Sequence, residues 1–274
     1  MTDFLQPAVR IRWRTALVLG PAVVLGLVMF CWPLLVGTAP GTEGAAGAAQ
    51  SAAGHGIDAP FVFMATLPVL ILIVLAELSS GGLDSKALAL LGVLSAVDAA
   101  LRPLGAGTGG IELVFFLLVL AGRVFGAGFG FVLGATSLFA SALLTGGVGP
   151  WLPFQMLASS LVGMGAGLLP SRVKGRWEIA MLSVYGVLAA YFYGLAMSMF
   201  TWPFLAGTSA LDFVPGAPIA ENLHRFLVFT VLTSTLGWDT GRALTNLAAI
   251  LLLGPAILLV LRRAARRAAF GPVS

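Results

Sequence analysis

The sequence is poor in cysteine and in charge. Its one cysteine, Cys31, lies inside an apolar run, and the count excludes a disulfide and a cysteine-based metal cluster. Only 9% of the 274 residues are charged, whereas 59% are hydrophobic. A soluble chain of this length needs far more charged residues to cover its surface. The composition therefore excludes a soluble globular protein and indicates a membrane protein.

Motifs that carry known chemistry are also lacking. The sequence has no GxxxxGK[ST] nucleotide loop, no HExxH or GxSxG motif and no paired histidines. We therefore expect no enzyme and no resident metal or cofactor, and any ATP hydrolysis must come from another subunit. The net charge of +4 does not indicate nucleic-acid binding, because the basic residues lie where membrane topology places them.

Long apolar runs occur along most of the chain. Runs of 18 residues or more are long enough for a helix to cross the bilayer, whereas a transmembrane β-barrel would show alternating segments of ~10 residues. We predict an all-α, polytopic membrane helical bundle with about eight transmembrane segments. Their ranges are 15–37, 60–79, 85–101, 111–122, 126–145, 152–170, 179–200 and 243–261.

The N-terminal part is expected to be an addition to the main bundle. The apolar segment 15–37 is too long for the hydrophobic region of a cleaved signal peptide, so a retained helix is expected. The stretch 38–59 is rich in small residues and predicts a flexible external linker, in which His55 is expected to be solvated. The predicted divisions are 1–59 (helix and linker), 60–84 (second added helix), 85–265 (membrane core) and 266–274 (basic tail).

Basic residues orient the predicted helices. With the N-terminus inside, the inner loops hold Arg10, Arg12, Arg14, Lys86, Arg123, Arg172, Lys174, Arg176, Arg262, Arg263, Arg266 and Arg267, and the outer loops hold Arg102, Arg225 and Arg242. This asymmetry predicts an inner (plasma) membrane protein with both termini cytoplasmic. It also requires an even number of crossings, so the short apolar piece 226–238 is expected to be an outer or re-entrant segment.

Small residues recur at every fourth position on three of the predicted spans. The rows are Gly92/Ala96/Ala100, Gly126/Gly130/Gly134 and Gly163/Gly167. This spacing lets helix backbones approach closely. For the glycine rows we expect packing inside the bundle. The row that begins at Gly92 fits either internal packing or contact with another membrane subunit.

Ionisable residues in membrane spans are costly and mark candidate functional sites. Asp98 and Arg102 lie four positions apart and are expected to pair with each other. Glu112 opens a segment of only ~12 apolar residues, which spans ~18 Å against a hydrocarbon core of ~30 Å. Glu112 therefore either lines a depression beside this short helix or complements the helix N-terminus.

The turn Thr145–Gln155 (TGGVGPWLPFQ) is the densest local signal. Pro153 suits the first turn of a helix, which places Gln155 just inside the helix start and near Trp151. Trp151 alone would be an interfacial anchor. An amide one turn below a tryptophan and a glycine-rich turn is more typical of a ligand wall.

A second polar group lies before and within the last predicted span. Asp239 is expected to cap that helix, which puts Arg242 and Asn246 on one face, toward the outer half of the bundle. The alternative is an Asp239–Arg242 pair at the helix end, which contributes little by itself. The outer loop 201–225 carries Trp202, and its aromatic content favours an ordered cap, although interfacial anchoring also explains that tryptophan.

Two stretches resemble the substrate-binding S components of energy-coupling factor (ECF) vitamin transporters. They are ELVFFLLVLAGRVFGAGFGFVLGATSLFASALLTGGVGPWLPFQMLASSLVGMGAGLLP from Glu112 to Pro170 and GWDTGRALTNLAAILLLGPAILLVLRR from Gly237 to Arg263. The GxxxGFxxG and GPWLPFQ motifs carry much of the resemblance, which covers about residues 85–265. It implies a six-helix core, from which the two N-terminal spans depart.

The resemblance implies a non-enzymatic subunit that binds a vitamin or vitamin precursor. Its partners would be a membrane scaffold (the T component), docked on the Gly92/Ala96/Ala100 row, and two cytoplasmic ATPase subunits. The candidate substrate-binding residues are Glu112, Trp151, Gln155, Trp202, Arg242 and Asn246.

The substrate cannot be read from these residues. Cobalamin or a related corrinoid is the first expectation, because the outer loops are large and no dedicated charge cluster is present. Thiamine precursors, riboflavin and other vitamins stay open. The alternative function is an autonomous secondary transporter or channel for a small solute, which would need midplane carboxylates and would usually show internal repeats; we detect neither.

Overall fold

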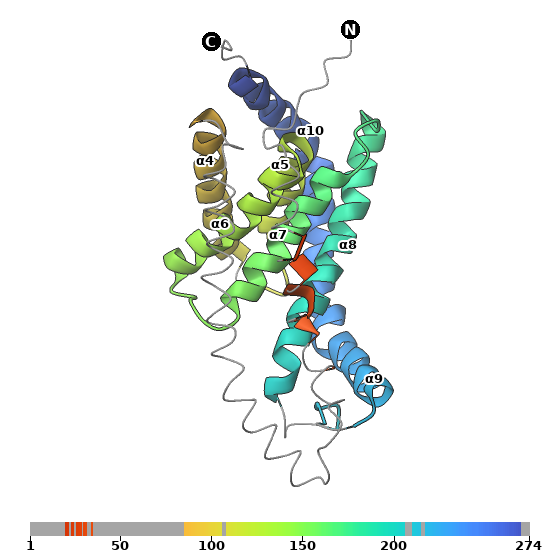
Figure 1. Ribbon diagram of the computed structural model, residues 1–274. Coiled ribbons are helices and arrows are strands. Elements are labelled where there is room, and N and C mark those ends of the chain that lie inside the picture. The colour runs from red at the N-terminus through yellow and green to blue at the C-terminus, as the bar shows by residue number, and fades with distance from the viewer. Residues whose placement is uncertain are drawn as a thin grey trace.

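The computed structural model describes residues 85–105, 108–205, 210–214 and 217–269, together with ten single positions between residues 20 and 34. The predicted span 60–79, the linker 38–59 and most of the span 15–37 lie outside the described residues. Across the described part of the chain the regular elements are all helical (Figure 1). They are α4 (Ser85–Leu101), the 3₁₀ turn η1 (Arg102–Gly105), α5 (Val114–Phe125), α6 (Ala127–Thr145), α7 (Leu152–Leu168), α8 (Arg176–Thr201), the 3₁₀ turn η2 (Trp202–Leu205), α9 (Ile219–Thr230), the π-helical section η3 (Val231–Asp239) and α10 (Thr240–Ala269).

The apolar runs predict these helices well. The range 85–101 is reproduced by α4, and α6 and α7 differ from prediction by one or two residues. The short helix predicted at 111–122 is confirmed as α5. It has twelve residues and begins and ends three positions later than predicted. Among the residues that the structure describes, four helical stretches are long and apolar enough to cross a membrane, and α5 and α7 are shorter apolar helices. The chain is therefore a multi-pass helical membrane protein.

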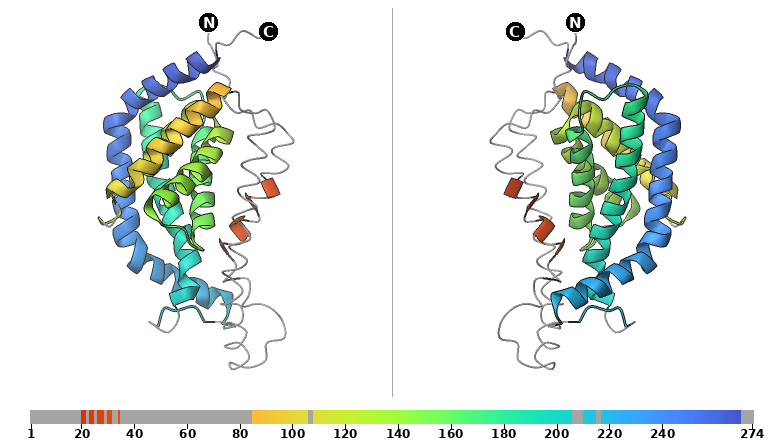
Figure 2. Two further views of the ribbon diagram at one scale, coloured as in Figure 1. Left: turned by 90° about the vertical axis from the view of Figure 1, so that its left-hand side faces the viewer. Right: turned by 90° about the vertical axis from the view of Figure 1, so that its right-hand side faces the viewer.

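The piece 226–238, predicted to be an outer or re-entrant segment, is continuous with the last helix. Residues 219–269 form one continuous helical run, in which η3 joins α9 to α10. No proline lies between Ile219 and Asp239, and the π-helical section keeps the backbone hydrogen-bonded while it changes the helix direction. Asp239 lies inside this run, so it does not cap the last helix as expected. Figure 2 shows α9 bending away from the direction of α10.

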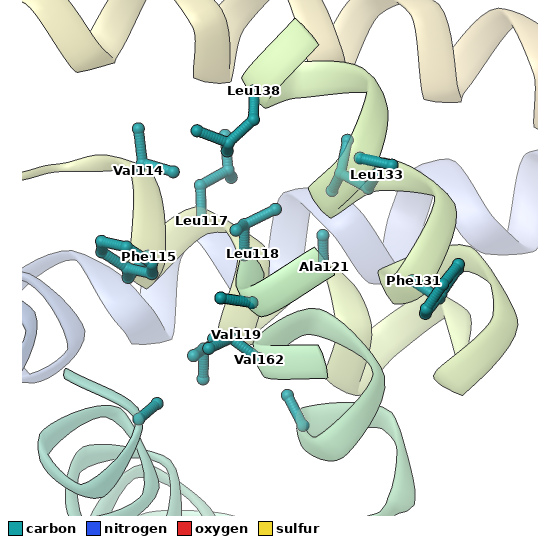
Figure 3. Packing of buried hydrophobic residues seen from close by; sticks show 14 of the residues in the cluster. Val114, Phe115, Leu117, Leu118, Val119, Ala121, Phe131, Leu133, Leu138 and Val162 are labelled. Carbon is teal, nitrogen blue, oxygen red and sulfur yellow. The ribbon is translucent and has the colours of Figure 1, made fainter. Parts of the chain in front are cut away.

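The core is built around α5. Ten of its twelve residues are buried, because α6, α7, α8 and α10 all pack against it. Figure 3 shows α5 side chains, among them Leu117 and Leu118, lying near Leu133 and Leu138 of α6. A helix too short to cross the bilayer alone is thus surrounded by longer helices, and its start lies among the polar groups described below.

The glycine rows pack inside the bundle, as predicted. A Cβ on Gly163 of α7 would overlap the backbone of Gly130 on α6, and one on Gly167 would overlap that of Ala127. Gly126 differs from these glycines. It lies between α5 and α6, and its φ of 95° allows the tight turn there. Gly92, by contrast, faces open space.

Candidate functional site

A buried arginine lies at the centre of a polar network, at the end of the bundle remote from the last turn of α10. Arg242, in the first turn of α10, is 6% exposed. Its Nε donates to Glu112 Oε2 and its Nη1 donates to Asp239 Oδ1, each over 2.8 Å. The guanidinium also lies 4.9 Å from the ring centroid of Tyr193 and 5.5 Å from that of Phe115. One cation therefore holds two carboxylates and two aromatic rings in place.

A glycine-rich loop brings Glu112 to this arginine. Gly110 has a φ of 84°, and a Cβ there would overlap the backbone of Trp238. Gly241 likewise has no side chain to separate α10 from the carbonyl of Gly109. Because the loop backbone packs directly on the start of α10, the Glu112 side chain reaches Arg242.

A third glycine makes room for the second carboxylate. A Cβ on Gly194 of α8 would occupy the position of the Asp239 carboxylate. Asp239 is 1% exposed, and its Oδ2 accepts a long hydrogen bond of 3.5 Å from Thr235. The pairing of Asp239 with Arg242, expected as the alternative to a binding role for this polar group, is thus present and buried. Tyr193 and Gly194 were missed, because an isolated tyrosine and glycine in an apolar span carry no local signal.

A second polar contact links η1, the turn that follows α4, to α7. Arg102 Nη2 donates to Gln155 Oε1 over 2.9 Å. The prediction of an ion pair between Asp98 and Arg102 is wrong. Asp98 lies on the buried face of α4, whereas α4 ends at Leu101 and Arg102 begins a 3₁₀ turn, so the four-residue helical spacing is not kept. The Asp98 carboxyl has no hydrogen-bond partner among the described residues.

The other predicted site residues lie in different surroundings. Trp151, just before α7, is 43% exposed. Asn246 is fully buried, and its Nδ2 donates to the carbonyl of Gly186 over 3.0 Å. Trp202 is also fully buried, with Nε1 bonded to the Leu211 carbonyl and its ring against Phe226. The structure thus joins Glu112 to Arg242 and Gln155 to Arg102, while Trp202 belongs to a separate small apolar cluster.

The charged groups of the Arg242 and Arg102 contacts balance. Arg102 and Arg242 supply two positive charges, and Glu112 and Asp239 supply two negative charges. Tyr193 lies within electrostatic range of Arg102, Arg242 and Glu112. No group of three or more histidine, cysteine, aspartate or glutamate side chains is found within the described part of the chain.

The opposite end of the bundle holds another ion network, which the sequence did not reveal. Glu178 of α8 accepts from Arg123 of α5 and from Arg262 of α10, each over 2.7 Å. Arg123 also donates to the carbonyls of Leu169 and Val173, each over 2.9 Å. These contacts join the ends of α5, α8 and α10 and the loop between α7 and α8.

A comparison with family models gives a match across most of the helical bundle described above. The family described as ECF-type riboflavin transporter, S component, matches residues 83–241, more than half of the chain. The matched range holds Glu112, Gln155 and Tyr193 and ends next to Arg242. Neither a curated protein nor a solved structure matches the chain.

Proposed function

The chain belongs to the family of ECF-type riboflavin transporter S components, and we propose that it binds a riboflavin-like vitamin beside the Arg242–Glu112 network for an ATP-driven importer. Membership of this family makes the chain a substrate-binding transport subunit. The particular substrate, site and partners are the proposal. The observation that carries it is the group of Arg242, Glu112 and Asp239 beside the rings of Tyr193 and Phe115, with Arg102 as the second cation that balances the two carboxylates.

The proposed site faces the outside of the cell. Arg262, Arg263, Arg266 and Arg267 lie in the C-terminal part of α10, at the other end from Arg242. Basic clusters of this kind remain on the cytoplasmic side. Their position supports a plasma-membrane protein whose C-terminus is cytoplasmic and whose Arg242 network lies at the outer end of the bundle.

The substrate class follows from charge and shape. A site without net charge does not favour a strongly anionic or cationic ligand, and aromatic faces stabilise a planar ring. The family match names riboflavin and gives no support to the expectation of cobalamin. We therefore place a neutral, planar vitamin first.

The outward face of α4 supports a membrane partner. Gly92, Ala96 and Ala100 are all exposed, with Val93 and Val97 beside them. The opposite face of α4 packs on α6. A lipid-facing row of small residues allows another helix to approach closely, so we propose this row as the docking surface for the T component, which in turn joins two ATPase subunits.

Transport by the assembled complex tests this proposal. Co-expression with a T component and two ATPase subunits should give vitamin uptake that stops when ATP hydrolysis is blocked. The control is an ATPase variant that assembles but does not hydrolyse ATP. Uptake by the purified chain alone, driven by an ion gradient, would contradict the proposal and favour a secondary transporter.

A further inference from the structure

The helical run from Ile219 to Ala269 is longer than one membrane crossing. At 1.5 Å per residue the run extends over ~75 Å, against a hydrocarbon core of ~30 Å. The part of α10 between Thr240 and Leu261 alone covers ~33 Å. Trp238 precedes this part and Arg262 follows it, residue types that mark the two membrane interfaces. Therefore α9 lies beyond the hydrocarbon core, on the proposed outer side.

Helix α9 has three distinct faces. Its first face is buried through Asn222, Phe226, Phe229 and Thr230, of which the two phenylalanines belong to the Trp202 cluster. The second is polar, since Arg225 Nη2 donates to Glu221 Oε1 over 2.7 Å and Nη1 to the carbonyl of Ala210 over 3.1 Å. The third is an aliphatic row at four-residue spacing, Ile219, Leu223 and Leu227, which continues to Val231 at the start of η3. These four side chains are 47%, 39%, 48% and 44% exposed.

This aliphatic row continues into a lipid-facing surface. Leu232, Leu236 and Trp238 are 60%, 68% and 46% exposed along η3. On α10 the exposed side chains include Leu244, Leu251 and Leu252, which lie along the stretch that spans the hydrocarbon core. The exposed apolar surface of α9 is thus the outer end of a surface that faces lipid. It forms a contiguous patch and is not a set of isolated apolar residues.

The bend at η3 gives α9 an oblique direction. Figures 1 and 2 show α9 inclined to the adjoining part of α10, beside the end of α8. A helix with an apolar row, a polar edge and an oblique direction at this depth has the features of a helix that lies in the membrane interface. The row also lacks the aromatic and arginine side chains that usually anchor a specific protein interface.

We propose that α9 is an interfacial helix of the outer leaflet, whose Ile219–Leu223–Leu227–Val231 row is inserted among lipid headgroups and upper acyl chains. The Glu221–Arg225 pair then faces water. The partner is the lipid surface itself. Because the buried face of α9 carries the Trp202 cluster, this anchoring holds that cluster at a constant depth relative to the bilayer.

Site-specific fluorescence quenching tests the proposal on the full-length protein. The native Cys31 is replaced by serine, and one cysteine is introduced by Leu223→Cys or, as a matched control two positions away, by Glu221→Cys. Each variant is labelled with an environment-sensitive dye and placed in phosphatidylcholine nanodiscs. The quenchers are iodide in the water and a lipid that carries a nitroxide near its headgroup. Leu227→Cys replaces Leu223→Cys if the latter does not fold.

We expect the dye at position 223 to show blue-shifted emission, strong quenching by the nitroxide lipid and weak quenching by iodide. The dye at position 221 should show the reverse. Equal quenching by iodide at both positions would overturn the proposal. Shielding from iodide at position 223 without lipid quenching would also overturn it, because protein would then cover the row.

Discussion

Arg242 at the start of α10 donates to Glu112 just ahead of α5 over 2.8 Å, although the two residues lie 130 positions apart. The same guanidinium binds Asp239, which is almost fully buried. Arg242 thus satisfies two carboxylates that come from different parts of the chain. This shared cation fixes the geometry of the proposed binding site.

Removing the charge of Arg242 should destabilise the protein. Arg242→Gln leaves the buried Asp239 carboxylate without a cation, a loss of about 3–5 kcal/mol. Glu112→Gln should cost much less, because the Glu112 side chain is 30% exposed and water screens it. Thermal unfolding in detergent measures both. The double variant Asp239→Asn with Arg242→Gln should recover part of the stability that Arg242→Gln loses. Equal stability of Arg242→Gln and Glu112→Gln would contradict the proposed role of the buried Asp239–Arg242 pair.

The parts of the structure that depend on local pattern were predictable. Apolar runs predicted α4 to α8 and α10, and four-residue glycine spacing predicted the packing of α6 on α7. The contacts that depend on distant residues were not. Arg102 was expected to bind its helical neighbour Asp98, yet it binds Gln155, because α4 tightens into a 3₁₀ turn at that point. The Glu112–Arg242 contact required the glycine loop to pack on α10, which no local pattern indicates.

Two glycine substitutions should have opposite effects on stability. Gly163→Ala places a methyl group against the backbone of Gly130, and such overpacking costs about 1–3 kcal/mol or more. Gly92→Ala, on the open face of α4, should leave stability unchanged or raise it slightly, because alanine favours helix. Thermal unfolding of the two variants in one detergent decides this. Equal losses would show that the row at Gly92 is also packed inside the protein.

The open face of α4 should control assembly. Ala96→Leu fills the small-residue row and should abolish co-purification with the T component, while folding and vitamin binding are retained. Val97→Leu, on the same exposed side of α4, is the matched control and should leave assembly intact. If the Ala96 variant still assembles in full, the T component docks elsewhere.

Gln155 should contribute to vitamin binding without being needed for folding. Gln155→Ala removes one polar partner and releases Arg102, so we expect affinity to fall about tenfold. Thr201→Ala is the control, since that hydroxyl bonds only to carbonyls of its own helix. Isothermal titration with riboflavin measures both. Unchanged affinity in the Gln155 variant, with a normal unfolding temperature, would remove this residue from the site.

The central claim is that this chain by itself binds a riboflavin-like vitamin. The most direct measurement is an equilibrium titration of the purified full-length chain in nanodiscs with riboflavin, with cobalamin and thiamine as competitors. The account predicts saturable binding of riboflavin at one molecule per chain, little affected by either competitor and weakened in Arg242→Gln. No saturable binding of riboflavin, or its displacement by cobalamin, would contradict the account.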